Sequence, residues 1–221
     1  MTYLWVATLL IGISLQILVI AALLRGAYRE FKILFVYIVA LFLTTVVEAA
    51  AFFNPQIWSH TSRYYWIADS IRQGLIYCVV IALTYRVMEN SRSRSAIQRA
   101  LVGGAILFTV LSLYFTRDPR FGFWMARVGR NLGFCAVILN LVLWAVLIKY
   151  RQANRLLLLI SGGLGIQMAG KAIGHSLRQF SQEVHSLIQI AGDLIIVLSH
   201  IACLYIWWQA FRTFDRREPE R

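Results

Sequence analysis

Residues 3–24 read YLWVATLLIGISLQILVIAALL, and residues 25–32 read RGAYREFK. The first segment has no charged residue and is long enough to cross a bilayer, because a helical span needs about 20 mostly apolar residues. No basic residue precedes it, whereas Arg25, Arg29 and Lys32 follow it directly. This flank is typical of a retained membrane span and not of a cleaved signal peptide. We therefore expect residues 3–24 to form a transmembrane helix.

The rest of the chain repeats this pattern. Of the 221 residues, 59% are hydrophobic and 14% are charged, and the mean hydropathy is +0.65. The apolar segments are continuous and lack the alternating pattern of outer-membrane strands. We predict an all-α integral membrane protein, a single heptahelical domain over residues 1–221 with a short charged tail at 211–221. The other six spans are predicted at 33–53, 64–87, 99–115, 124–148, 155–177 and 187–210.

The sixth predicted span is the weakest of the seven. Its unbroken apolar part, from Leu156 to Gly170, is too short to cross a bilayer unless the helix continues through Lys171 and His175. A bundle of six spans with a re-entrant segment is therefore the alternative to seven spans.

The distribution of basic residues predicts the orientation. Fourteen of the 22 Lys and Arg residues lie at the loops and tail on one side of the predicted bundle, and six lie on the other side. Because the more basic side is normally cytoplasmic, we expect the N-terminus outside and the C-terminus inside, in a plasma (inner) membrane. The loop from Thr116 to Arg127 is an exception, since it carries three Arg on the outer side.

The net charge of +12 does not indicate a nucleic-acid-binding protein. The basic residues are spread over the predicted cytoplasmic edges, where they set orientation and attract anionic headgroups of the bilayer. The sequence contains no phosphate-binding glycine loop, kinase motif or zinc motif. It also has no loop long enough to form a separate soluble domain. We therefore expect a non-enzymatic protein.

Six Asp, Glu, Lys and Arg residues lie well inside the predicted spans, away from the cytoplasmic and outer ends, where a charge costs several kcal/mol unless it is paired or hydrated. The helical rise of about 1.5 Å per residue places all six roughly 5 to 10 Å to the outer side of the midplane. Such a common depth predicts a buried ligand or ion-pair site. The six residues are Glu48, Asp69, Arg72, Arg130, Lys171 and Asp193.

Pairing among these residues can be predicted only in part. Asp69 and Arg72 are three residues apart on one helix and can pair locally. Glu48 and Asp193 then need Arg130 or Lys171 as a partner. Alternatively, the two long basic side chains extend to the interface, and the Asp69–Arg72 pair is only structural.

Small residues form a stripe on the sixth predicted span. Ser161, Gly165 and Ala169 recur every four residues, and further glycines lie beside them. Small residues allow helix backbones to approach closely. The stripe therefore predicts tight packing against a neighbouring helix or another subunit, with a hinge or a ligand wall as the alternative.

Histidine and lysine raise the question of a pigment or haem. His200 is the one histidine near a predicted midplane and is a possible axial ligand for haem or chlorophyll, but a second histidine at that depth is missing. A hydrogen-bonded core histidine is the alternative.

Seven helices with an outside N-terminus resemble rhodopsins and heptahelical receptors in topology only, because retinal proteins carry their Schiff-base lysine on the seventh helix. The one lysine inside a span here is Lys171, on the sixth.

Three functions fit this sequence. The first is a heptahelical sensor or small-ligand-binding protein with an outer-half polar site, which would need a signalling partner. The second is an accessory subunit of a larger membrane complex. The third is a small transporter or proton-coupled channel, which is disfavoured because internal repeats and inner-half polar residues are missing. We prefer the first, and expect Asp193→Asn or Glu48→Gln to alter a ligand response.

Overall fold

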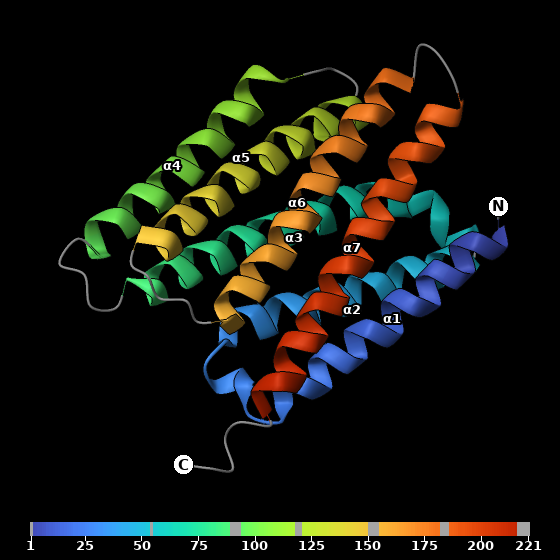
Figure 1. Ribbon diagram of the computed structural model, residues 1–221. Helices are drawn as coiled ribbons and strands as arrows, with labels where there is room; N and C mark the ends of the chain where they lie inside the picture. Colours follow the sequence, from blue (N-terminus) through green and yellow to red (C-terminus); the bar gives the residue numbers. More distant parts are fainter. Residues whose placement is uncertain are drawn as a thin grey trace.

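The computed structural model describes residues 2–53, 55–88, 94–117, 121–149, 155–181 and 186–215. Over these residues the chain is helical, and seven of its helices are long and apolar enough to cross a membrane. The prediction of an all-helical fold with seven candidate spans is confirmed (Figure 1). The helices are α1 (Thr2–Leu24), α2 (Lys32–Phe53), α3 (Pro55–Val87), α4 (Arg94–Phe115), α5 (Phe121–Lys149), α6 (Arg155–Ser181) and α7 (Ser186–Asp215), with a short 3-10 helix, η1 (Ala27–Arg29), between α1 and α2.

Some helix ends differ from the prediction. α3 begins at Pro55, well before the predicted start at residue 64, because polar residues continue the helix beyond the apolar span. α6 is one continuous helix of 27 residues, so its structure is that of a full span and not of a re-entrant segment. α7 continues to Asp215, so the predicted tail begins as helix, and Phe211 is buried. Residues 216–221 lie outside the described residues.

The helices form one bundle with two distinct edges. α4 lies at one edge, where it contacts α3 and α5, and α1 lies toward the opposite edge, against α2 and α7 (Figure 1). We call the end of the bundle where α1 begins the N-terminal end, and the end where α7 finishes the C-terminal end. Successive helices run in opposite directions, so the last part of α2, the first part of α3 and the last part of α6 all lie toward the N-terminal end.

α6 and α7 form the most extensive helix pair, and glycines bring them together. A Cβ on Gly174 would lie 2.7 Å from the carbonyl oxygen of Gly192, and one on Gly163 would lie 2.8 Å from Nε1 of Trp207. A Cβ on Gly170 would overlap the side chain of Ser199. Larger residues at these positions would force the two helices apart.

The predicted stripe lies on a different face of α6. A Cβ on Gly165 would lie 2.8 Å from Nδ2 of Asn140 on α5, and Ser161 is fully buried. Ala169 is half-buried. The close approach expected at Gly165 is therefore made inside this chain, between α6 and α5.

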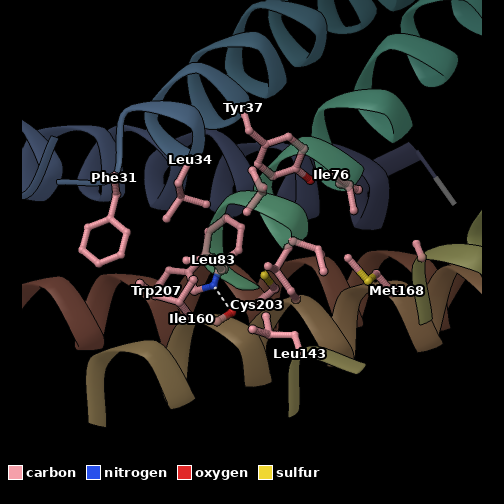
Figure 2. Close-up of a cluster of buried hydrophobic side chains, with 14 of the residues drawn as sticks. Phe31, Leu34, Tyr37, Ile76, Leu83, Leu143, Ile160, Met168, Cys203 and Trp207 are labelled. Atoms are coloured by element: carbon pink, nitrogen blue, oxygen red, sulfur yellow. Dashed lines mark hydrogen bonds between the residues drawn. The ribbon is translucent and has the colours of Figure 1, made fainter. Parts of the chain in front are cut away.

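A cluster of buried apolar side chains lies between the helices (Figure 2). Trp207 of α7 is fully buried and donates a hydrogen bond of 2.9 Å from Nε1 to the carbonyl oxygen of Ile160 on α6. Its ring meets the ring of Tyr37 edge-on, with centroids 6.0 Å apart. These contacts of Trp207 join α2, α6 and α7 on the side of Lys171 that is nearer the C-terminal end of the bundle.

The C-terminal end is also tied together at the turn after α1. Gly26 adopts a φ of 151°, a conformation that favours glycine, and η1 follows it. Arg86 of α3 pairs with Glu30, donates 2.8 Å to the Glu30 carbonyl oxygen and lies over the ring of Phe31. This ion pair is partly exposed, in contrast to the pairs described next.

Candidate functional site

Four of the six ionisable residues form a continuous ion-pair network between three helices. Arg72 of α3 places Nη1 3.0 Å from Oε1 of Glu48 on α2 and Nη2 3.4 Å from Oδ1 of Asp69. Lys171 of α6 places Nζ 3.3 Å from the same Asp69 oxygen. The side chains of Arg72, Asp69 and Lys171 are only 10%, 13% and 17% exposed. The local pair predicted between Asp69 and Arg72 is present, and two further helices are connected to it.

Of the other two ionisable residues, Asp193 belongs to a second ion pair. Asp193 of α7 pairs with Arg178 of α6, and both side chains are more exposed, at 47% and 38%. The structure thus pairs Asp193 with a residue that the sequence analysis did not consider, and pairs Glu48 with Arg72 instead of Arg130 or Lys171. Arg130 is half-buried on α5, next to Gly129, where an added Cβ would lie 3.8 Å from Oδ2 of Asp69.

The network forms part of the wall of a cavity of about 220 Å³ toward the N-terminal end of the bundle. α1, α2, α3, α6 and α7 all contribute to the wall, which includes all four networked residues as well as His175 and Arg178. Ligand pockets are usually about 300–1,000 Å³, so this cavity suits a very small molecule. Arg130 and Asp193 do not belong to the wall.

Uncharged polar side chains form the deeper part of the wall. The amide Nε2 of Gln167 lies 3.0 Å from Nδ1 of His200 and donates a hydrogen bond of 3.0 Å to the hydroxyl of Tyr37. Nε2 of His200 lies 3.4 Å from the amide nitrogen of Gln16, which donates 3.2 Å to Oγ1 of Thr45. These polar side chains connect α1, α2, α6 and α7. They lie nearer the C-terminal end of the bundle than the ion pairs do.

These contacts bear on the possible cofactors. Both ring nitrogens of His200 lie within hydrogen-bonding distance of a glutamine amide, which is the arrangement of a hydrogen-bonded core histidine. An axial ligand needs one of these nitrogens for the metal, so the residues around His200 do not fit haem or chlorophyll as they stand. Lys171 Nζ, the one candidate for a retinal linkage, is ion-paired with Asp69. His185 lies outside the described residues.

Two acceptor oxygens at the cavity have no hydrogen-bond donor among the described residues. Oε1 of Gln16 is one, and the Gln16 side chain is almost completely buried, with 1% of the residue exposed. Oε1 of Glu48 is the other, since it lies at ion-pair distance from Arg72 but in a geometry that makes no hydrogen bond. A buried acceptor without a donor costs about 1–3 kcal/mol, so a molecule in the cavity that carries N–H or O–H groups would be stabilised here.

A notch in α1 lies beside these acceptors. Gly12 belongs to the cavity wall and is buried, yet a Cβ added to it would meet no atom within 4 Å. Leu9, Ile196 and Val197 are apolar members of the same wall. The cavity therefore has an apolar side next to its polar groups.

Two further polar side chains, on α3 and α5, contact other helices. Gln73 donates 3.1 Å to the carbonyl oxygen of Leu132 on α5 and is buried in that contact. Asn131 donates 3.2 Å to Oγ of Ser112 on α4. These two residues hold neighbouring helices together and do not line the cavity.

Sequence reasoning missed Gln16, Thr45 and Tyr37, and placed His175 at a helix end. Gln16 could have been found, because it is the one amide in the apolar segment 3–24 and a polar side chain at that depth needs partners. Tyr37 carries no such signal, because tyrosine is common in membrane helices.

Comparison with known proteins adds no further information about the site. The chain matches no protein-family model, no curated protein and no solved structure. The structural class of the protein is therefore defined by its fold and its cavity: it is a seven-helix bundle with a small polar cavity toward its N-terminal end.

Proposed function

We propose that this protein is a non-enzymatic heptahelical membrane sensor that binds a small polar molecule in the cavity between α1, α2, α3, α6 and α7. The N-terminal end faces outside and the C-terminal end faces the cytoplasm, in accordance with the distribution of basic residues. The ligand therefore arrives from the outer side of the membrane.

The observation that carries this proposal is the composition of the cavity wall. Ion-paired side chains and a buried glutamine converge from five helices on one space of about 220 Å³. Two of the acceptor oxygens there, on Gln16 and Glu48, have no donor in the described part of the chain. Charges placed inside a membrane bundle are functional-site candidates, and a cavity with unmet hydrogen-bonding groups among them is suited to a ligand.

The same residues connect the cavity to the opposite end of the bundle. His200 and Gln167 lie in the deep layer of the wall on α7 and α6, and Gln167 bonds Tyr37, which packs against Trp207. Trp207 in turn bonds α6 near its start. A ligand that shifts α6 relative to α7 at the cavity would thus change their contact near the cytoplasmic loops. In this proposal the sensor reports to a partner protein at these loops.

The two alternatives have less support. The accessory-subunit interpretation drew on the small residues of α6, and the structure uses Gly163, Gly165 and Gly174 for contacts within the chain. Transport would require a polar path beyond the cavity. The residues that follow toward the C-terminal end include Leu164, Cys203 and Trp207, which are fully buried and apolar in character.

Filling the cavity tests the proposal. Gly12→Phe directs a ring into the space in which a Cβ meets nothing, and Gly104→Phe is the matched control, because a Cβ on Gly104 also meets nothing but its surface is the exposed face of α4. The wild type and both variants are purified, and their melting temperatures are measured with a panel of small water-soluble compounds. A compound at 100 times its Kd stabilises the folded state by about 2.7 kcal/mol.

We expect one or more compounds to raise the Tm of the wild type and of Gly104→Phe, and to leave the Tm of Gly12→Phe unchanged. If every stabilising compound acts equally on Gly12→Phe, binding occurs elsewhere and the proposed site is wrong. A panel without any stabilising compound contradicts the ligand-binding function itself.

A further inference from the structure

We infer that the ligand is a dipolar molecule of small amino-acid size, with an ammonium group and a carboxylate group on a short apolar skeleton. This inference rests on the proposed ligand-binding function and specifies the ligand's chemical class. It follows from the positions of unmet acceptors, available donors, net charge and apolar surface around the cavity.

The side of the cavity formed by α1 and α2 accepts hydrogen bonds. Gln16 and Glu48 both belong to this part of the wall, and Oε1 of each is a buried acceptor that has no donor among the described residues. Thr45, to which Gln16 donates a hydrogen bond, lies three residues before Glu48 on α2, so the Gln16 side chain meets α2 within about one helical turn of Glu48. An ammonium group carries several N–H donors and can satisfy Glu48 by charge and Gln16 by hydrogen bonding.

The opposite side of the cavity, formed by α6, donates hydrogen bonds. Lys171 belongs to the wall, and its Nζ has three N–H donors, of which one is directed to Oδ1 of Asp69 at 3.3 Å. That distance is long for a charge-assisted hydrogen bond, which is usually about 2.7–2.9 Å. A ligand carboxylate can therefore bind Lys171 in addition to Asp69.

The balance of charge favours a ligand with no net charge. The wall contains three cations, Arg72, Lys171 and Arg178, and two carboxylates, Glu48 and Asp69. Asp193 pairs with Arg178, so the ion pairs described above for these wall residues contain three cations and three carboxylates. A simple cation or anion would add an unbalanced charge to this weakly hydrated region, which is costly. A dipolar molecule adds none and presents each of its charges to the complementary side.

The apolar part of the cavity wall and the cavity volume limit the size of the ligand's carbon skeleton. Leu9, Ile196 and Val197 form an apolar part of the wall, and the missing side chain of Gly12 leaves room beside them. A cavity of about 220 Å³ admits a short aliphatic side chain and excludes large rings with long substituents. Valine, with its branched three-carbon side chain, is a suitable probe molecule.

The experiment compares L-valine with its two halves. Isobutylamine lacks the carboxylate, and 3-methylbutanoate lacks the ammonium. Binding of each to the full chain in lipid nanodiscs is measured by isothermal titration calorimetry, with xylitol as an uncharged hydroxyl compound. A hydrogen bond to a charged group contributes about 1.5–3 kcal/mol, so each half should bind at least about tenfold more weakly than L-valine.

Two cavity variants and one control test which residue binds the ammonium group of the ligand and which binds its carboxylate group. Lys171→Met should weaken L-valine about tenfold or more and leave isobutylamine unaffected. Glu48→Gln should weaken L-valine similarly and leave 3-methylbutanoate unaffected. Glu30→Gln, which removes a charge from the partly exposed ion pair with Arg86, is the control and should change none of the affinities. If either cavity variant fails to fold, the wild-type ranking of L-valine against its halves still decides the question.

The outcomes separate this inference from the proposed function. If one half binds as tightly as L-valine, or if xylitol alone binds, the dipolar ligand is wrong, while the cavity remains a binding site provided that Gly12→Phe abolishes that binding. If none of the four compounds binds, the dipolar ligand is also wrong, and the broader panel on Gly12→Phe and Gly104→Phe decides the proposed function independently.

Discussion

Asp69 is the residue on which the ion-pair network depends. One of its oxygens lies 3.4 Å from Arg72 and 3.3 Å from Lys171, so a single carboxylate connects α3 with α6. Glu48 extends the same network to α2 through Arg72. Replacing one member of a buried pair is more harmful than replacing an exposed pair, because the remaining charge stays without compensation in a region of low dielectric.

We expect Asp69→Asn to destabilise the protein by about 3 kcal/mol, the lower part of the range for breaking a buried ion pair. Glu30→Gln, in the partly exposed pair with Arg86, should cost about 1 kcal/mol or less. Both values are compared through thermal melting of the purified variants in the same detergent. Equal, small losses of stability would show that water, and not the neighbouring carboxylate, compensates Arg72 and Lys171.

At the scale of the element, α6 has two faces made of small residues that serve different neighbours. Gly163, Gly170 and Gly174 bring α6 against α7, whereas Gly165 brings it against α5. Because α6 also carries Lys171 and Gln167 into the cavity, its distance from α7 determines how closely these side chains approach His200. The packing of this one helix therefore controls the geometry of the site.

We expect Gly174→Ala to destabilise the bundle by about 1–3 kcal/mol, since the added methyl group would lie 2.7 Å from the Gly192 carbonyl oxygen and backbone atoms cannot rotate away. Gly103→Ala on α4 is the matched control, because a Cβ there meets nothing within 4 Å. The control should be neutral or stabilising by up to about 1 kcal/mol, from helix propensity. Thermal melting of the two variants provides the comparison, and an unchanged Tm for Gly174→Ala would mean that the two helices separate easily.

At the scale of the whole molecule, seven candidate spans would place the start of α1 and the end of α7 on opposite sides of a membrane. The helix ends on either side of the α1–α2, α3–α4 and α5–α6 connections share the C-terminal end of the bundle with the end of α7 (Figure 1). The basic residues at this end in the described part of the chain are Arg25, Arg29, Lys32, Arg86, Arg94, Arg99, Lys149, Arg155 and Arg212. The proposed orientation therefore depends on basic residues that the structure gathers on one end.

This orientation predicts which engineered thiols react from outside a cell. In a chain whose three cysteines are replaced, Arg117→Cys should react with a membrane-impermeant maleimide in intact cells. Arg25→Cys should react only after the cells are opened. Both positions are exposed in the structure, so accessibility to solvent is matched. Labelling of Arg25→Cys in intact cells would show that the proposed orientation is wrong. The cavity would then lie toward the cytoplasmic side.

The sequence by itself determined the helical class of the fold, and it predicted a common depth for the charged residues. Continuous apolar segments can satisfy their backbone groups in a membrane only as helices, and the fixed rise of a helix converts residue number into depth. For the same reason the local pair between Asp69 and Arg72 was predictable, since the two residues share one face of one helix.

Only the tertiary structure decided which of these residues meet. Depth does not determine the rotation of a helix about its axis or its choice of neighbours, and both depend on packing between helices. Packing directs Glu48 and Lys171 to the Asp69–Arg72 pair, and it directs Asp193 to Arg178 at the rim. It also brings Gln16 of α1 beside His200 of α7, a contact between residues 184 positions apart in the chain that no local pattern could reveal.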